Sequence, residues 1–315
     1  MKTILVTGGA GFIGSHVCDR LLAMGFNVVC VDNFNDYYPP EIKRKNISHN
    51  LSKKEFALVK ADIADYCAME DIFRMQIDSV IHLAARAGVR PSLENPFIYE
   101  ETNIRGTLNL LELSRKNKVA SFIFGSSSSV YGLKNKTPFT EDDRTDAPIS
   151  PYAATKKAGE VLCYTYSKIY GLKCICLRFF TVYGPRGRPD MAPYLFTKAI
   201  DAGEEIFLFG DGSTRRDYTY IEDITEGIIA CLGKDYTYEI FNLGNSRTVS
   251  LGELVTTIEQ KLGKKAKIVR KPIPPGDVLV TYADISKATR LLGYSPKTSI
   301  TKGISNFVDW YHGKH

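Results

Sequence analysis

The sequence contains neither a long hydrophobic run nor a paired-cysteine motif. No apolar stretch approaches the roughly 18 residues of a membrane-spanning helix, and the first residues resemble a strand rather than a signal peptide. The seven cysteines, an odd number without a C-x-x-C pair, are typical of a reducing compartment, and most of them lie inside apolar runs, as small core residues do. We therefore expect a cytoplasmic protein with no membrane partner.

A strong excess of one charge, internal repeats and low-complexity tracts are also missing. The net charge of +6 is spread along 315 residues, and the densest basic stretch, residues 264–271, alternates with apolar residues as in an exposed strand. We expect no nucleic-acid partner, although a mildly positive cleft would suit an anionic substrate. With 44% hydrophobic and 24% charged residues, the chain can form one large α/β domain with a smaller appendage, or two domains.

A glycine-rich turn follows the first apolar run. Gly8, Gly11 and Gly14 are spaced G-x-x-G-x-x-G, where a buried strand would turn into a helix beginning near Phe12. Without a Cβ, the backbone can turn tightly and approach a pyrophosphate, which the N–H groups at the helix start would face. Asp32, 18 residues past Gly14, closes the next apolar run. A carboxylate there suits a ribose 2′-hydroxyl and repels a 2′-phosphate, which favours NAD over NADP.

An ordinary glycine turn between two packed elements is the alternative that needs no ligand. The succession of strand, turn, helix, second strand and terminal aspartate argues against it.

Strand-length apolar runs alternate with segments of helical periodicity. The alternation predicts a Rossmann-type doubly wound α/β fold, with a parallel sheet and ligands at the carboxyl ends of its strands. We expect an NAD-binding domain over residues 1–180, with a later segment near 215–245 returning to it, and a smaller α/β substrate lobe over 181–315. Residues 33–52 form an insertion that we expect to lie over the cofactor. The apolar runs span residues 3–7, 27–31, 56–59, 78–83, 121–125 and 172–178.

Tyr152 and Lys156 are the candidate catalytic pair. They are four residues apart in a helical stretch and so share one face. A nearby ammonium stabilises a phenolate, so the tyrosine can serve as a base near neutral pH. The same spacing recurs at Tyr164 with Lys168 and at Tyr194 with Lys198. Tyr152 begins its helix just after Pro151, where a site at a strand end could reach it, and it follows the serine run that ends the fifth predicted strand. We interpret Tyr164 as a packing residue and Tyr194 as part of the second lobe or its surface.

Four consecutive serines, residues 126–129, end the fifth predicted strand. This stretch is too polar for a buried strand end without a partner. Hydroxyls that cap turns explain it without any ligand. With Tyr152 downstream, we favour substrate contact from Ser127, Ser128 and Ser129.

Over essentially its whole length the chain resembles the extended short-chain dehydrogenase/reductases of the nucleotide-sugar epimerase/dehydratase group. The resemblance rests on the glycine turn, the segment His82 to Ala85, Asn103-x-x-Gly106-Thr107, the segment Ser128 to Gly132, Tyr152 with Lys156, and Arg216-Asp217-Tyr218. Within that group, stretches 32–38, 85–90 and 178–191 are most similar to the UDP-glucuronate 4-epimerases.

The resemblance implies roles for individual residues. It implies a catalytic set of Tyr152, Lys156 and Ser127, with Ser127 at the sugar O4. The cofactor-binding residues it implies are Gly8, Gly11, Phe12, Ile13, Gly14, Asp32, Asn33, Asp62, Ile63, Leu83, Ala84, Ala85, Asn103, Tyr152 and Lys156. The substrate-binding residues it implies are Arg90, Ser127, Ser128, Ser129, Thr181, Arg188, Arg216 and Asp277. It implies no metal, and a homodimer formed through helices near 98–117 and 152–170.

The sequence leaves alternatives open for the roles of three of these arginines. UDP-galactose 4-epimerases carry an arginine near the diphosphate where this chain has Pro274, so Arg216 or Arg188 would carry more of that charge. Arg90 could instead be an ordinary surface residue, and Arg188 could instead pair with Asp190.

The implied reaction is the 4-epimerisation of a UDP-hexuronic acid, UDP-glucuronate to UDP-galacturonate, through a transient 4-keto sugar. NAD would stay tightly bound and be recycled in each turnover, and no CO₂ would be lost. The alternatives are a UDP-glucuronate decarboxylase, a 4-epimerase of another UDP-sugar, and a 4,6-dehydratase, which needs an acid and a base where Ser128 and Ser129 stand. The remote alternative is a non-catalytic NAD or nucleotide-sugar sensing module; such relatives usually lose the tyrosine or the lysine, and this chain keeps both Tyr152 and Lys156.

Overall fold

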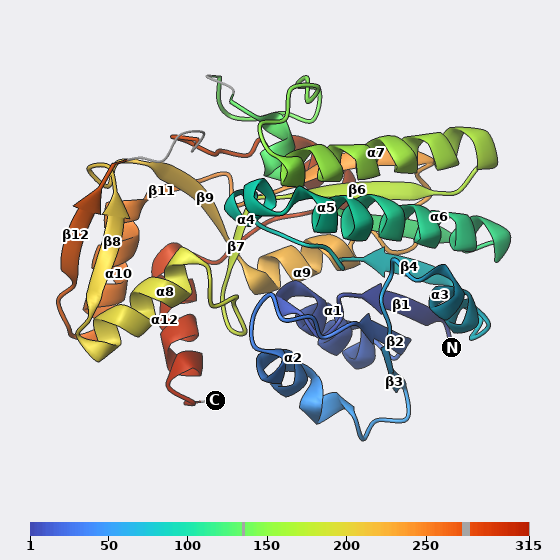
Figure 1. Ribbon diagram of the computed structural model, residues 1–315, viewed down its shortest axis with the longest axis horizontal. Helices are drawn as coiled ribbons and strands as arrows, with labels where there is room; N and C mark the ends of the chain where they lie inside the picture. The colour runs from blue at the N-terminus through green and yellow to red at the C-terminus, as the bar shows by residue number, and fades with distance from the viewer. Residues whose placement is uncertain (134–135, 273–277, 315) are drawn as a thin grey trace. The chain divides into compact units, whose positions relative to one another are not determined.

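The computed structural model describes residues 1–133, 136–272 and 278–314. The chain divides into two compact units (Figure 1). The first comprises Met1–Gly132, Glu141–Phe179 and Thr225–Phe241, and the second comprises Leu133–Thr140, Phe180–Ile224 and Asn242–His315.

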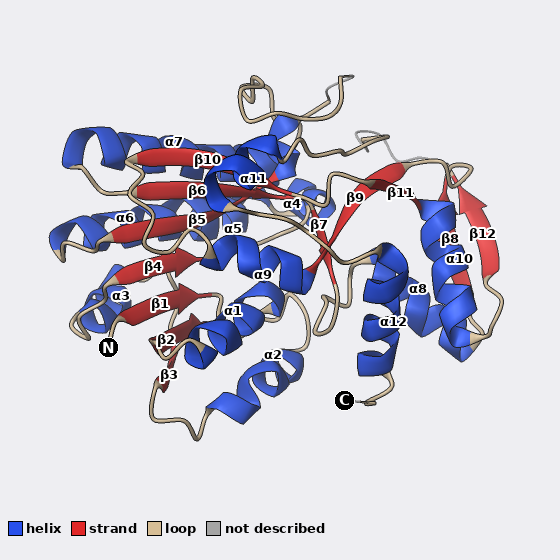
Figure 2. Cartoon of the chain, turned by 180° about the vertical axis from the view of Figure 1, so that it is seen from behind, coloured by secondary structure: helices blue, strands red, loops and turns tan. Residues whose placement is uncertain are grey.

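The first unit is built on a seven-stranded sheet whose strands lie side by side (Figure 2). In spatial order the strands are β3 (Phe56–Lys60), β2 (Asn27–Asp32), β1 (Thr3–Thr7), β4 (Ser79–His82), β5 (Ser121–Ser127), β6 (Cys174–Phe179) and β10 (Tyr238–Leu243). Neighbouring strands from β3 to β6 pair in parallel. Order 3-2-1-4-5-6 is that of the doubly wound dinucleotide-binding fold, as the alternation of apolar runs predicts.

Helices cover both faces of this sheet, and so its central strands are apolar almost throughout. Helices α3, α6 and α7 cover one face (Figure 1), and α1 and α9 the other (Figure 2). The core beneath α3, α6 and α7 includes Leu110, Phe122 and Phe124 at 0–1% exposure. The helical segments are α1 (Phe12–Ala23), α2 (Pro40–Ile47), η1 (Ser48–Asn50), α3 (Tyr66–Phe73), α4 (Val89–Glu94), α5 (Pro96–Tyr99), the π-helical η2 (Glu100–Arg105), α6 (Gly106–Lys116), η3 (Ser128–Tyr131), α7 (Pro151–Tyr170) and α9 (Ile221–Ile229), which enters this unit at Thr225.

The second unit contains two small sheets and four helices among the residues that are described. One sheet has the order β11 (Thr248–Ser250), β9 (Arg215–Tyr220), β7 (Thr181–Tyr183), and the other pairs β12 (Lys267–Lys271) with β8 (Glu205–Phe209). The helices are α8 (Ala192–Ala202), α10 (Leu251–Leu262), α11 (Ser286–Leu292) and α12 (Ile300–Tyr311).

The units differ from the expected domain boundaries at both ends of the returning segment and in one earlier stretch. Residues 215–224 belong to the second unit because β9 pairs there with β7 and β11, so the returning segment is Thr225–Phe241. Residues 133–140 also belong to the second unit. Buried Phe139 is held there at both ends of its peptide, since its N–H donates to the Tyr282 carbonyl at 2.7 Å and its carbonyl accepts from Asn242 at 2.9 Å.

Within the described part of the chain, no helix combines the length and apolarity needed to cross a membrane.

Candidate active site

The glycine turn joins β1 to α1, which begins at Phe12 as predicted. Gly8 has a φ of +68°, and a Cβ on Gly14 would lie 2.1 Å from the Gly8 carbonyl oxygen. A Cβ on Gly8 would lie 2.7 Å from the Ala84 nitrogen. No described side chain caps the first turn of α1 at Gly11. Within the turn, the N–H groups of Gly8, Gly9 and Gly11 already donate to backbone carbonyls. The N–H groups of the first turn of α1, at the positive end of the helix, are therefore the ones placed to bind a pyrophosphate.

Asp32 ends β2 and is 6% exposed. Its Oδ1 accepts from the Phe34 N–H at 2.9 Å and lies 3.7 Å from the Lys43 ammonium nitrogen. Lys43 also donates to the carbonyl and the side-chain oxygen of Asn35, both at 3.1 Å. Burial lowers the pKa of Lys43, although the Asp32 carboxylate opposes that shift. A buried cation beside the predicted ribose-binding carboxylate did not follow from the sequence, because Lys43 lies in a charged stretch that looks solvent-exposed.

The other residues implied for the adenosine end form a small polar cluster. Asn33 donates to Asp62 at 2.8 Å, and Asp62 also accepts from the Ala64 N–H at 2.9 Å. The carbonyl of Ile63 accepts from Asn109 at 3.0 Å. Asp32 and Asn33 follow β2 and Asp62 follows β3, so they share the carboxyl edge of the sheet with the glycine turn.

The insertion after β2 contains α2, η1 and a loop that lies against the glycine turn. Buried Asn46 donates to the Ala10 carbonyl at 3.1 Å. The Tyr38 hydroxyl oxygen lies 3.8 Å from where a Cβ on Gly11 would be. The expected position of the insertion, over the cofactor, remains a prediction, and these contacts support it.

His82 ends β4 directly before Leu83, Ala84 and Ala85, and it is 1% exposed. Its Nδ1 lies 2.8 Å from the Thr7 hydroxyl, and its Nε2 lies 2.9 Å from the Thr107 hydroxyl. Thr107 donates its proton to the Asn103 carbonyl at 2.6 Å, so it accepts from Nε2–H and thereby sets the tautomer. Burial lowers the pKa of His82 to about 3, which keeps the ring neutral.

Asn103 lies in η2, a π-helical turn of the kind often found at functional sites. Its side chain accepts from the Arg86 N–H at 2.8 Å and donates to the Arg86 carbonyl and to Thr155, both at 3.0 Å. Thr155 donates to the Tyr152 carbonyl at 2.9 Å. Both amide hydrogens of Asn103 are thus used inside the protein, where they tie the 85–88 loop to the start of α7.

Tyr152 and Lys156 lie in the first two turns of α7. Ser150 caps this helix by accepting from the Ala153 N–H at 3.1 Å. Lys156 is 5% exposed and donates to the Gly125 carbonyl at 2.7 Å, and burial lowers its pKa to about 7. The Tyr152 ring packs edge-on against Tyr99, with ring centroids 6.2 Å apart.

The two other tyrosines that share this spacing have different surroundings. Tyr164 is 48% exposed and packs edge-on against Tyr238, with ring centroids 5.2 Å apart. Tyr194 lies in the first turn of α8 and packs against Phe307 and Trp310 of α12. Both are packing residues in the structure.

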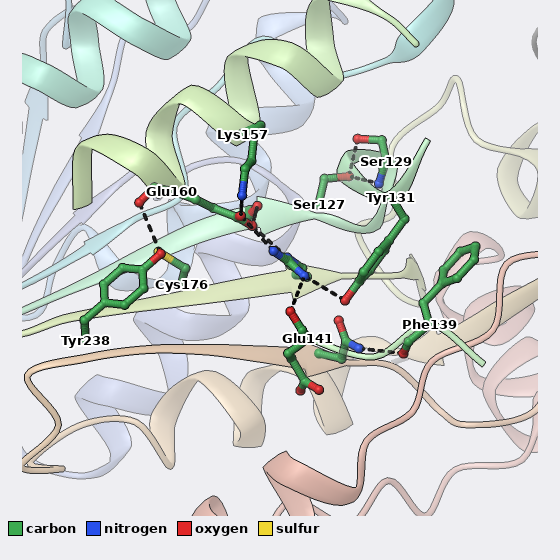
Figure 3. A network of polar contacts seen from close by, with 12 residues as sticks. Ser127, Ser129, Tyr131, Phe139, Glu141, Lys157, Glu160, Cys176 and Tyr238 are labelled. Carbon is green, nitrogen blue, oxygen red and sulfur yellow. Dashed lines mark hydrogen bonds and ion pairs between the residues drawn. The ribbon is translucent and has the colours of Figure 1, made fainter. Parts of the chain in front are cut away.

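The four serines divide into one buried and three half-buried side chains. Ser126 is 2% exposed and donates to Glu160 at 2.7 Å. Ser127 caps η3 by accepting from the Ser129 N–H at 3.2 Å, and it also accepts from the Ser129 hydroxyl at 2.9 Å (Figure 3). Turn capping thus accounts for part of the polarity, while Ser127, Ser128 and Ser129 stay partly accessible at the end of β5.

The candidate arginines and Thr181 are placed as follows. Arg90 is exposed on α4 in the first unit. Thr181 pairs with Tyr218 in the second unit. In that unit Arg188 donates to Asp190 at 2.9 Å, the ion pair considered above, and Arg216 donates to the carbonyls of Arg215 and Leu279 at 3.0 and 3.3 Å. Asp277 and Pro274 lie outside the described residues.

The first unit therefore brings four strand ends to one edge of its sheet: the glycine turn after β1, Asp32 after β2, Leu83–Ala85 after β4 and Ser127 after β5. This is where doubly wound folds bind nucleotides. Among the described residues, no cluster of three or more His, Cys, Asp or Glu side chains is arranged to hold a metal ion.

Comparison with known proteins gives consistent matches over almost the whole chain. Residues 5–307 match the family model described as GDP-mannose 4,6 dehydratase. A UDP-glucuronate 4-epimerase of Thermodesulfobacterium geofontis is 47% identical over 312 residues, which cover 98% of this chain and 96% of that protein.

Solved structures agree with these matches. The UDP-glucuronic acid 4-epimerase of Bacillus cereus, in complex with UDP-glucuronic acid and NAD, has a TM-score of 0.93 at 38% identity and covers 99% of this chain and 100% of its own. The UDP-glucose 4-epimerase of Thermotoga maritima, with UDP-glucose, has a TM-score of 0.91 at 36% identity and covers 99% of each chain. The chain therefore belongs to the extended short-chain dehydrogenase/reductase family of nucleotide-sugar epimerases and dehydratases.

Proposed function

We propose that this protein is an NAD-dependent UDP-sugar 4-epimerase that converts UDP-glucuronate to UDP-galacturonate without decarboxylation. The observation that carries the proposal is the hydrogen bond that Lys156 donates to the Gly125 carbonyl at 2.7 Å. Lys156 lies on the same helix as Tyr152, and Gly125 lies two residues before Ser127. Relatives at 47% and 38% identity are UDP-glucuronate 4-epimerases.

The glycine turn and Asp32 fit NAD. A Cβ on Gly14 or Gly8 would collide with backbone, so only a bare turn can form there, and it leaves space beside the helix start for a pyrophosphate. Asp32 and Lys43 would hold the adenosine ribose, and Lys156 the nicotinamide ribose. When bound, NAD supplies a reversible acceptor for the hydride at C4 of the sugar.

The chain's own residues would move the proton. Tyr152 removes the proton of the C4 hydroxyl as the hydride leaves, and it returns that proton when the hydride comes back on the opposite face. Ser127 donates a hydrogen bond to O4 throughout. Positioned acid–base groups of this kind contribute about 10²- to 10⁴-fold to rate.

The keto sugar is a β-keto acid, so the carboxylate has to be kept out of alignment with the carbonyl π system. Ser127, Ser128 and Thr181 are the small, directional donors that we assign to this task. Each neutral hydrogen bond contributes only about 0.5–1.5 kcal/mol, so several have to act together. Arg90, Arg188 and Arg216 are the residues that we propose for the diphosphate and sugar acid.

The family model carries the name of a 4,6-dehydratase, yet serine hydroxyls stand at positions 128 and 129 where that reaction needs an acid and a base. UDP-glucuronate decarboxylase and 4-epimerisation of another UDP-sugar are the alternatives that product analysis separates. A homodimer formed through the helices near 98–117 and 152–170 remains a prediction.

The test is incubation of the purified protein with UDP-glucuronate, with products resolved by NMR. We expect UDP-galacturonate, and deuterium placed at C4 should remain in the product. Conversion mainly into UDP-xylose or a 4-keto-pentose with release of CO₂, or loss of the label to solvent, would contradict the proposal.

A pair of tyrosine variants tests the catalytic assignment. Tyr152→Phe should lose about 10²- to 10⁴-fold in kcat. Tyr164→Phe is the matched control because it has the same helix and the same Y-x-x-x-K spacing, and it should retain activity. A Tyr152→Phe protein with full turnover would remove the assigned base, and a protein that binds the nucleotide sugar without turnover would be a sensing module.

A further inference from the structure

Glu160 and Arg178 form an ion pair buried beneath the candidate active site. Each side chain is 1% exposed. Arg178 Nε lies 2.8 Å from Glu160 Oε1, and its Nη2 lies 2.9 Å from Oε2 (Figure 3). Burying two charges costs several kcal/mol, and the pair is commonly no more stabilising than apolar side chains of similar volume. Its presence here calls for a role other than stability.

Glu160 continues the stripe of α7 that carries the candidate catalytic pair. Tyr152, Lys156 and Glu160 recur every four residues and so lie on one face of the helix. Lys156 binds the Gly125 carbonyl, and Glu160 accepts from the Ser126 hydroxyl at 2.7 Å. The same face of α7 is thus fastened to two consecutive residues of β5.

A close contact reinforces this register between helix and strand. A Cβ on Gly159 would lie 2.3 Å from the Phe124 ring, so α7 approaches β5 more closely than any larger residue would permit. Gly125 and Ser126, the next residues of β5, are the partners of Lys156 and Glu160. The helix can therefore neither slide nor rotate without losing all of these contacts together.

The ion pair also reaches the far end of the serine segment. Arg178 Nη1 donates to the Tyr131 hydroxyl at 2.9 Å, and the Arg178 guanidinium lies 4.8 Å from the centre of the Tyr131 ring. It also donates to the Glu141 carbonyl at 3.4 Å (Figure 3). Ser126 precedes Ser127, and Tyr131 follows Ser129 by two residues, so one ion pair holds both ends of the turn formed by Ser127, Ser128 and Ser129.

We infer that Glu160 and Arg178 are positioning residues that hold the serine turn in register with Tyr152 and thereby decide between epimerisation and decarboxylation. This inference rests on the proposed function. The donors on the turn keep the carboxylate of the keto sugar away from decarboxylating alignment only while the turn is rigid, because misplacement by about 1 Å can cost about 10²-fold in rate.

The competing reaction is balanced without any further reagent. The bond between C5 and the carboxyl carbon breaks, CO₂ leaves, and the electron pair passes into the C4 carbonyl as an enolate. A proton from solvent or from an acidic side chain then adds at C5. The product is a UDP-4-keto-pentose, which keeps its C4 ketone. If the hydride returns to C4 the final product is a UDP-pentose and no net redox change occurs; if the keto sugar leaves first, the two electrons taken from the sugar would stay with the cofactor.

Two variants cut the links between the ion pair and the turn while leaving both charges in place. Tyr131→Phe removes the hydroxyl that Arg178 binds, and Ser126→Ala removes the hydroxyl that Glu160 binds. Products are quantified by NMR with UDP-glucuronate labelled at the carboxyl carbon, and reduced cofactor is followed by absorbance. We expect kcat to fall about 3- to 10-fold in each variant with KM changed less than about twofold, and decarboxylated product to rise at least about fivefold as a share of the total.

Lys157→Met is the matched control. Lys157 lies 3.3 Å from the same Glu160 carboxylate but is 28% exposed, and its substitution leaves the Ser126 and Tyr131 hydroxyls in place. This variant should keep the wild-type product ratio. Glu160→Gln keeps one acceptor for Ser126 and Arg178 Nε but places an amide donor against Arg178 Nη2. It should shift the ratio further than either link variant if it folds, and the two link variants decide the matter if it does not.

The outcomes separate the two proposals. Wild-type protein that fails to epimerise UDP-glucuronate overturns the proposed function and this inference with it. Wild-type epimerisation with unchanged product ratios in both Tyr131→Phe and Ser126→Ala overturns the inference alone. A fall in kcat without any change in product ratio also overturns it, since a merely structural role would have that effect.

Discussion

The side-chain amide of Asn46 donates a 3.1 Å hydrogen bond to the backbone carbonyl of Ala10, in the middle of the glycine turn. The two residues are 36 positions apart and belong to different segments, the insertion after β2 and the turn after β1. Both groups are buried, so the bond fastens the insertion to the turn that we assign to the pyrophosphate.

Asn46→Ala should therefore weaken cofactor retention. The buried Ala10 carbonyl would lose its donor, at a cost of about 1–3 kcal/mol, and the turn would become less rigid. We expect the free energy of unfolding to fall by about 1–2 kcal/mol and the NAD content of the purified protein to fall.

Asn117→Ala is the control for this variant. Its side chain makes the same type of bond, to the Leu113 carbonyl at 2.9 Å, at the opposite end of the sheet. It should lose stability without losing NAD. Equal NAD content in Asn46→Ala and wild type would refute the assigned link.

The buried Lys43 beside Asp32 predicts how cofactor choice can be altered. In Asp32→Asn the repulsion of a 2′-phosphate disappears while the cation remains, so NADP binding should improve relative to NAD by about tenfold, or about 1.4 kcal/mol. Adding Lys43→Met should abolish that gain. The measurement is titration of cofactor-depleted protein with each dinucleotide, and a gain that persists in the double variant would show that Lys43 is not involved.

His82 predicts a loss of stability in acid. The folded-state pKa of about 3 lies below the ordinary 6.5, so the unfolded chain binds more protons between these values and stability falls as pH drops below about 6.5. The expected loss from this group is about 2 kcal/mol at pH 5 relative to pH 8. His82→Gln keeps a donor and an acceptor for Thr107 and Thr7 but does not titrate. Denaturant unfolding should show a flatter pH dependence for this variant, and parallel curves would contradict the account.

We expect the buried Lys156 to be needed for turnover and to lower the stability of the fold. Its pKa of about 7, lowered by burial, lies below the ordinary 10.5, so the unfolded chain binds more protons between these values. The lysine therefore costs about 4 kcal/mol of stability near pH 7, and this cost is lost as pH rises towards about 10.5. Lys156→Met should lose turnover. Its free energy of unfolding should nevertheless rise by about 2 kcal/mol near pH 6.5, which allows for the donor that the Gly125 carbonyl loses.

By about pH 9.5 most of this gain in the free energy of unfolding should disappear. Lys156 is then neutral in folded wild type, and protonating it in the unfolded chain contributes less free energy than at pH 6.5. Lys157→Met, at the neighbouring half-buried position, is the control for the loss of a lysine from this helix. Unfolding in urea at both pH values is the measurement, and a Lys156→Met protein that is less stable than wild type at pH 6.5 would show that the charge is not destabilising.

Local patterns were sufficient for much of the fold. β1, the turn and α1 follow from an apolar run, three glycines and a helical period within about 20 residues, and α7 starts at Pro151, next to the Tyr152 start that the sequence predicts. Tyr152 could be preferred to Tyr164 for the same reason, since its place at a helix start is a local property.

The sequence by itself determined the α/β alternation, the glycine turn and the spacing of Tyr152 and Lys156, because each depends on neighbours within a few turns or one strand. Only the tertiary structure decided that Lys43 lies buried beside Asp32 and that Glu160 meets Arg178. Charged residues in a helix look solvent-exposed in sequence. The burial of Glu160 depends on the register of β5 and β6, which places Ser126 opposite Arg178, and that of Lys43 on the packing of the insertion against the end of β2. Both are properties of segments that are distant along the chain.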